Sequence, residues 1–435
     1  MESGLFRRRA TTAAGLWGSA ALGVLATVAA VRILDDEEAF GAFAVVVATA
    51  SFFQTLLDLT VEEALTKYGF RYLAAGDPGR LRRLFRKALV LKLAGGVLAL
   101  VALLALAPFA DTLLNGDGLG WYLVIVAALP LVQSPENVGS TALILHGRYD
   151  LRALFLALAM ALRLAGIGIG AAFGVGWALA GVVVAQVVST AAIATAGLVA
   201  YRRLPTGEER ALGEDVPEIR RFVLTSSLST GTVALRSSLV PVILSAVTTP
   251  RQAGFLRIAQ APQAGFTALT GPIRLILLTE QTKAWEEGRR REVVRGVYRY
   301  MAGAVAFCLV AVPVFYALMP WLVRTVFGTD YVDATHAARI VLFAAAIHLV
   351  LGWTKSFAVT VGRPGFRLVA HGVETAVLVP LTAILGARSG VDGAAWAFLV
   401  SAGAFAVVWA LLLLRIRWEV AGADARSTGG GALQP

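Results

Sequence analysis

Four arginines fall within long apolar stretches of the chain, where a charge needs a specific reason. They are Arg163, Arg236, Arg257 and Arg274. A charge near the middle of a bilayer costs roughly 2.5–3.5 kcal/mol on insertion scales, so such a residue normally faces a cavity or a partner. Arginine keeps its charge and offers a planar fork of donors that suits phosphate oxygens. These residues predict a site for an anion; the alternative is that Arg257 and Arg274 extend to lipid headgroups.

Acidic residues and one histidine also fall within apolar stretches. Asp58 and Glu62 are four residues apart and would share one face of a continuous helix, and His371 and Glu374 are three apart. Carboxylates within membrane spans often form ion or proton relays, so all four residues are candidates for coupling. The alternatives are that the carboxylates pair with the arginines or sit in water at the cytoplasmic mouth, and that His371 is simply packed.

The composition indicates a membrane protein. The 435 residues are 57% hydrophobic and only 15% charged, and apolar runs of about 20 residues recur along the chain. The net charge of +11 comes largely from Lys and Arg beside these runs, so we expect no nucleic-acid partner. The chain has no Walker loop and no cluster with metal-ligand spacing. We therefore expect a protein that is not an enzyme and binds no metal or cofactor.

Twelve transmembrane helices are predicted. Their approximate spans are 10–31, 39–66, 88–110, 119–141, 153–173, 176–200, 222–248, 252–280, 297–319, 337–361, 366–387 and 392–414. The N-terminus, the even-numbered loops and the tail carry 27 of the 39 Lys and Arg residues. This alternation predicts a multi-pass protein with both termini in the cytoplasm.

The chain repeats its landmarks at an offset near half its length. Gly147-Arg148-Tyr149-Asp150-Leu151-Arg152 reappears as Gly362-Arg363-Pro364-Gly365-Phe366-Arg367, and Phe40-Gly41-Ala42-Phe43 resembles Ala253-Gly254-Phe255-Leu256. We therefore predict an all-α membrane protein of two pseudosymmetric six-helix bundles. The predicted parts are an N-terminal bundle at 1–205, a cytoplasmic linker at 206–221, a C-terminal bundle at 222–418 and a disordered cytoplasmic tail at 419–435.

Local motifs resemble a transporter superfamily. The superfamily's pattern at the start of span 2 is similar to Ala39-Phe40-Gly41-Ala42-Phe43, and its pattern at the end of that span is similar to the stretch from Leu57 to Leu65. Its pattern at the start of span 8 is similar to Ala253-Gly254-Phe255-Leu256-Arg257-Ile258-Ala259. The chain resembles the multidrug/oligosaccharidyl-lipid/polysaccharide (MOP) exporters, and most of all their O-antigen and capsule repeat-unit flippases. Thr60 departs from the glycine usual there. The resemblance implies a V-shaped bundle pair in which spans 1, 2, 7 and 8 line a central cleft.

The resemblance also implies a function. A flippase of this kind would move a polyprenyl-pyrophosphate-linked oligosaccharide across the plasma (inner) membrane by alternating access. Arg236, Arg257, Arg274 and Arg163 would bind the pyrophosphate, while Gln260 and Gln263 would hydrogen bond sugar hydroxyls. Its partners would be this glycan lipid and the bilayer, with a polysaccharide polymerase and glycosyltransferases as further candidates.

Three other functions stay open at this point. A cation-coupled multidrug antiporter of the same superfamily would need acidic residues such as Asp58 and Glu62 to dominate the cavity. A flippase of the peptidoglycan precursor lies between this antiporter and the glycan flippase, although such proteins often have additional spans. A membrane-embedded glycan transferase or polymerase is disfavoured because the loops are too short for a catalytic domain.

Overall fold

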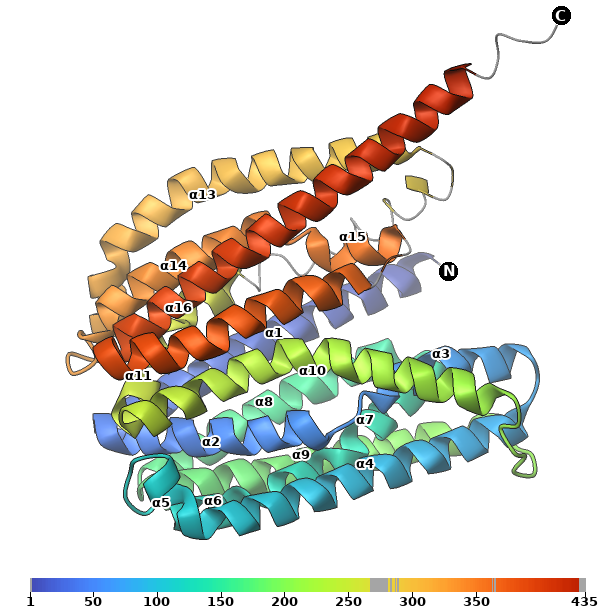
Figure 1. Cartoon of the computed structure of the whole chain (residues 1–435). Coiled ribbons are helices and arrows are strands. Elements are labelled where there is room, and N and C mark those ends of the chain that lie inside the picture. The colour runs from blue at the N-terminus through green and yellow to red at the C-terminus, as the bar shows by residue number, and fades with distance from the viewer. Residues whose placement is uncertain are drawn as a thin grey trace, which may run out of the picture. The chain divides into compact units, whose positions relative to one another are not determined.

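The protein is an all-α membrane protein, as predicted. The computed structural model describes residues 2–266, 281, 284, 285, 287, 289–361, 363 and 365–429, and every regular element within this part is helical (Figure 1). Eight helical stretches in it are long and apolar enough to cross a membrane, and two shorter apolar helices accompany them. The stretch Gly365–Glu419 alone holds two of the predicted spans, so these helices are consistent with about twelve crossings in two bundles.

By their contacts the residues form two compact units, each of which has its own packing. The first is Met1–Arg257 with Arg324–Tyr331, and the second is Ile258–Val323 with Val332–Pro435. The first unit contains α1 Glu2–Leu34, α2 Glu37–Leu57, α3 Val61–Ala74, α4 Pro78–Leu106, η1 Ala107–Phe109, α5 Ala110–Leu113, α6 Leu119–Val126, α7 Leu129–Leu145, α8 Tyr149–Ala171, α9 Val175–Arg202, α10 Asp215–Val247 and most of α11 Pro250–Ala259.

Close helix packing holds the first unit together. Helix α1 packs along α8, α8 and α7 pack on α9, and α10 runs beside α2 (Figure 1). At the α8–α9 crossing, a Cβ atom added to Gly166 would lie 2.3 Å from the carbonyl oxygen of Gly181. Only glycine allows two backbones to approach this closely, which is a common device between membrane helices.

The second unit is built around aromatic side chains. It contains α13 Arg290–Val326 up to Val323, α14 Ala334–Val350, α15 Thr354–Thr360 and α16 Gly365–Gly429. Trp353, Phe357, Phe405 and Trp409 are buried in its core and meet edge to face. Helix α16 turns sharply at Ser389 and Gly390, where Gly390 has a φ of 57°, so it consists of two helical segments.

Three spans predicted as continuous helices are broken, which corrects the sequence analysis. Span 39–66 breaks between α2 and α3, span 119–141 between α6 and α7, and span 337–361 between α14 and α15. The second break precedes Pro130, which has no N–H group to continue a helical ladder. Most of span 252–280 lies outside the described residues.

The bounds of the predicted parts also differ from the observed packing. Helix α10 begins within the expected linker 206–221 and packs on α2 and α3, so the contact boundary falls at Arg257. The tail expected to be disordered from residue 419 is instead helical up to Gly429, because α16 runs on through it.

Candidate functional site: charges within the spanning helices

Two of the predicted arginines lie together in the first unit. Arg163 on α8 is half-buried and Arg257 on α11 is exposed, and they are close enough for their positive charges to repel each other. Neither makes a hydrogen bond or an ion pair with another side chain in the described part of the chain. Two like charges from separate helices are unfavourable in a membrane unless a ligand compensates them. We call these two residues the arginine pair.

Of the other residues predicted to bind the substrate, the structure describes only some. Arg236 is on helix α10, but its side chain is outside what the structure describes, and Arg274 is outside the described residues altogether. Gln260 lies in the turn after α11, and Gln263 in the helical residues 261–266 that follow. Both glutamines are half-buried members of the second unit, and their shared role with Arg257 stays a prediction.

The break between α2 and α3 holds an ionic cluster. The Nζ atom of Lys92 on α4 lies 2.8 Å from carboxylate oxygens of both Asp58 and Glu62, and the Lys92 side chain is only 1% exposed. Asp58 caps the end of α2, and the N–H of Thr60 in the break donates to Ser227 Oγ at 2.8 Å. We call Asp58, Lys92 and Glu62 the lysine cluster; with both carboxylates ionised its net charge is −1.

This cluster corrects the prediction that Asp58 and Glu62 share a face of one continuous helix. Lys92 draws the two carboxylates together from opposite sides of a break, and neither pairs with an arginine whose side chain the structure describes. Lys92 also stands within an apolar run of the sequence, and the pattern of residues does not assign its partners. An amine in such a run must find carboxylates, and that requirement could have linked these residues.

A second carboxylate within the first unit has neutral partners. Gln186 Nε2 on α9 donates to Glu136 Oε2 on α7 at 2.8 Å, and the Thr190 hydroxyl lies 3.5 Å from the same oxygen. Glu136 was not among the predicted site residues, although it too stands in an apolar span. It contributes a half-buried polar contact between two helices.

The second unit brings His371 and Glu374 together, as their spacing allowed. The Nδ1 atom of His371 lies 3.1 Å from Glu374 Oε2. His348 on α14, which the sequence analysis missed, places its Nε2 atom 3.0 Å from the other oxygen, Oε1. A histidine in an apolar helix was the available clue to this third member.

The two copies of one repeated landmark touch each other. A Cβ atom added to Gly254 on α11 would lie 3.0 Å from the Cα atom of Gly41 on α2. The rings of Phe40 and Phe255 both meet Tyr331 edge on. An ion pair between Arg251 and Glu37 links the same two helices. Burial and the neighbouring carboxylate of Glu37 raise the pKa of Tyr331. The landmark therefore forms a helix contact on the side predicted to be extracytoplasmic.

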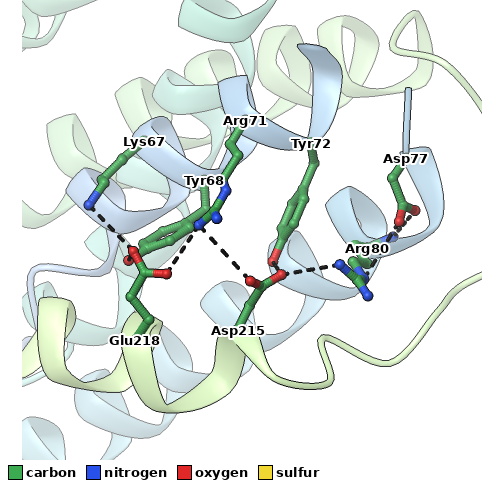
Figure 2. Close-up of polar contacts among 8 residues, drawn as sticks. All are labelled: Lys67, Tyr68, Arg71, Tyr72, Asp77, Arg80, Asp215 and Glu218. Carbon is green, nitrogen blue, oxygen red and sulfur yellow. Dashed lines mark hydrogen bonds and ion pairs between the residues drawn. The ribbon is translucent and has the colours of Figure 1, made fainter. Parts of the chain in front are cut away.

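On the side predicted to be cytoplasmic, ion pairs join α3 and α4 to the start of α10 (Figure 2). Figure 2 shows Asp215 between Tyr72 and Arg80, and Glu218 between Tyr68 and Arg71. Burial and the hydrogen bond to Glu218 raise the pKa of Tyr68 to about 12. These eight labelled residues form a polar network outside the spans.

An apolar groove lies in the second unit between α13, α14 and the second segment of α16. Its volume is about 790 Å³. Residues that line it include Met301, Leu309, Phe343, Ala406 and Trp409. The shape and lining suit a hydrocarbon chain rather than a polar ligand.

Comparison with known families decides the classification. The model of the family described as polysaccharide biosynthesis protein matches residues 10–268, which is more than half of the chain. The chain belongs to this polysaccharide biosynthesis family. Comparison with curated protein sequences finds no match.

Solved structures place this family member among the MOP-superfamily folds. An inward-facing multidrug resistance MATE family transporter of the MOP superfamily is 16% identical, with a TM-score of 0.68, and the match covers 95% of this chain and 94% of that one. The lipid II flippase MurJ in an inward closed conformation is 11% identical, with a TM-score of 0.69 and coverage of 94% and 90%. At these identities the likeness shows the fold.

A third match comes from Pyrococcus furiosus. It is a MOP superfamily transporter whose reversed binding-pocket polarity suggests a different function for it, and it is 16% identical with a TM-score of 0.58 and coverage of 96% of both chains. The polysaccharide biosynthesis family member described here is thus a multi-pass membrane protein with a MOP-type fold.

Proposed function

We propose that this protein is a flippase that moves a polyprenyl-pyrophosphate-linked oligosaccharide from the inner to the outer leaflet of the plasma membrane. The observation that carries the proposal is the arginine pair, Arg163 and Arg257, which has no anionic partner among the described residues. A pyrophosphate offers several acceptor oxygens and at least two negative charges, and two guanidinium groups match both. The family and the transporter-type fold support the same reading.

Other parts of the protein are chemically suited to the sugars and the lipid chain of the cargo. Gln260 and Gln263 can hydrogen bond sugar hydroxyls through their amide groups. The apolar groove of the second unit suits the isoprenoid chain, which stays in the hydrocarbon region while the charged headgroup crosses. The cargo would be assembled by glycosyltransferases and used by a polysaccharide polymerase, and we expect both termini in the cytoplasm.

Export of organic cations is less well supported. A cation site needs carboxylates whose charge is available, but Asp58 and Glu62 are both 2.8 Å from Lys92. The lysine cluster therefore already contains the cation that would neutralise them. Among the described residues of the first unit's spans, Arg163 and Arg257 have no anionic partner, and Glu136 has the neutral partners Gln186 and Thr190.

The test is transport by purified protein in proteoliposomes. The probe is a fluorescent polyprenyl-pyrophosphate disaccharide, and its exposure in the outer leaflet is measured with a membrane-impermeant quencher. The double variant R163Q/R257Q should lower the rate at least about tenfold, because each charge-assisted hydrogen bond contributes about 1.5–3 kcal/mol. R339Q serves as a control, since Arg339 is a half-buried arginine of the second unit whose guanidinium donates to the carbonyl of Tyr316. An unchanged rate in the double variant would refute the site.

A further inference from the structure

A buried carboxylate in the second unit is held between two imidazoles. The Glu374 side chain is 1% exposed, while those of His348 and His371 are 21% and 11% exposed. The three residues, which we call the His–Glu–His cluster, come from α14 and the first segment of α16. All three belong to predicted membrane spans, where ionisable groups are expensive and mark functional pathways.

The distances in the cluster allow each imidazole to share a proton with the carboxylate. His348 Nε2 approaches Oε1 of Glu374 at 3.0 Å, and His371 Nδ1 approaches Oε2 at 3.1 Å. Each nitrogen therefore meets its own carboxylate oxygen at hydrogen-bonding distance instead of converging with the other on one point. In the part of the chain that the structure describes, no group of His, Cys, Asp and Glu residues has an arrangement that would hold a metal ion. A proton is the ligand that this arrangement suits.

Other titratable groups stand on the elements packed around the cluster. On α13, the Tyr300 hydroxyl donates to the carbonyl of Leu349 at 2.8 Å, and Cys308 lines the apolar groove. Arg367 lies about one turn before His371 on α16, and Lys355 belongs to α15, with a side chain outside the described set. Arg415 and Glu419, near the far end of α16, pair with each other.

We propose that the His–Glu–His cluster binds and releases the proton that drives transport. Histidine is the side chain whose charge ordinarily changes near neutral pH, so an imidazole can take up a proton on one side of the membrane and lose it on the other. Uptake converts a hydrogen bond between a neutral imidazole and the Glu374 carboxylate into an ion pair, and release reverses it. This inference rests on the proposed function, because it names the coupling ion for that transport.

The aromatic packing gives protonation a mechanical consequence. The His371 ring stacks on Phe405 of the second α16 segment, with centroids 4.9 Å apart and planes at 25°, and His348 lies 5.4 Å from the same ring. A charged imidazole over Phe405 gains a cation–π attraction that a neutral one lacks. The Phe405 ring also meets the ring of Trp409 edge to face, and Trp409 lines the apolar groove. The protonation state therefore changes the packing of α14 and α16 beside the groove proposed for the lipid tail.

The first arm of the test observes proton binding directly. The chain has four histidines, His146, His336, His348 and His371, so selective ¹⁵N-histidine labelling gives few enough signals to assign by single His→Gln variants. We expect the signals of His348 and His371 to titrate in a coupled manner in the wild type and separately in E374Q. Identical titration curves in wild type and E374Q would overturn the proposal. H336Q is the matched control, since His336 is 64% exposed and pairs with Asp392.

The second arm measures the energy source of transport with the same fluorescent polyprenyl-pyrophosphate disaccharide. With one proton per cargo, a gradient of one pH unit should sustain an accumulation of about tenfold. E374Q should still equilibrate the probe but lose this accumulation, and H348Q, which keeps the His371–Glu374 contact, should weaken it. Gradient-driven accumulation that persists in E374Q would overturn the proposal. If wild type moves no probe under any gradient, the proposed function fails, and the titration alone decides the proton site.

Discussion

Two sets of cations in the spanning helices of the first unit differ in their surroundings. Lys92 is buried between two carboxylates at 2.8 Å, whereas Arg163 and Arg257 lie near enough to repel each other and have no acidic partner among the described residues. A compensated buried charge helps to fix a fold but has little charge left to offer a ligand. An uncompensated pair costs free energy in the empty protein and is retained where a ligand repays it. Partners, more than location, therefore separate structural charges from binding charges.

The largest expected effect comes from breaking the lysine cluster. K92M leaves two carboxylates close together without their counter-charge, so we expect a loss of about 3 kcal/mol in the free energy of unfolding. Thermal unfolding of the purified protein in detergent measures it. The triple variant K92M/D58N/E62Q removes the stranded charges as well and should recover most of the loss. Equal melting temperatures for wild type and K92M would show that the lysine is not structural.

The next effect comes from giving the arginine pair the kind of partner that Lys92 has. R163E places a carboxylate near Arg257. The protein should stay folded, but the new carboxylate would neutralise Arg257 and take the place of the anionic ligand. We expect transport of the pyrophosphate-linked probe to fall by at least about tenfold, since a charge-assisted contact is replaced by repulsion. The melting temperature serves as the control. Transport at the wild-type rate would mean that the cargo does not use this pair.

A smaller effect is expected from D58N. Lys92 keeps Glu62 at 2.8 Å, and the cluster changes from a net charge of −1 to neutral. We expect a change of no more than about 1 kcal/mol in unfolding free energy, because the lysine keeps a charged partner. If D58N were as damaging as K92M, the two carboxylates would not share the role assigned to them.

A further effect appears only at high pH and concerns the polar network outside the membrane. The pKa of Tyr68 is raised from 10 to about 12 by burial and by its bond to Glu218. The folded protein therefore holds this proton where the unfolded chain has lost it, so stability is present below pH 10 and falls as the pH rises from about 10 to 12. Unfolding followed against pH should show this decline, and it should be reduced in Y68F. A decline of the same size in Y68F would assign it to other groups.

The sequence predicted the helices and the charged residues better than it predicted their partners. Apolar length indicates a span, and Arg163 and Arg257 stood out because arginine is rare within one. Their proximity could not be read from the sequence, since 94 residues separate them. The break at Asp58–Thr60 was missed because the stretch around it contains no glycine or proline, and the contacts with Lys92 and Ser227 are tertiary. His348 was missed because its contact, too, is tertiary.

Equilibrium binding of the lipid-linked probe tests the central claim most directly. The fluorescent polyprenyl-pyrophosphate disaccharide and an analogue with an uncharged linker are titrated onto wild type and R163Q/R257Q in nanodiscs. We predict that wild type prefers the pyrophosphate lipid and that the double variant loses at least about tenfold of that affinity while binding the uncharged analogue as wild type does. Equal affinity of both proteins for the pyrophosphate lipid would contradict the account.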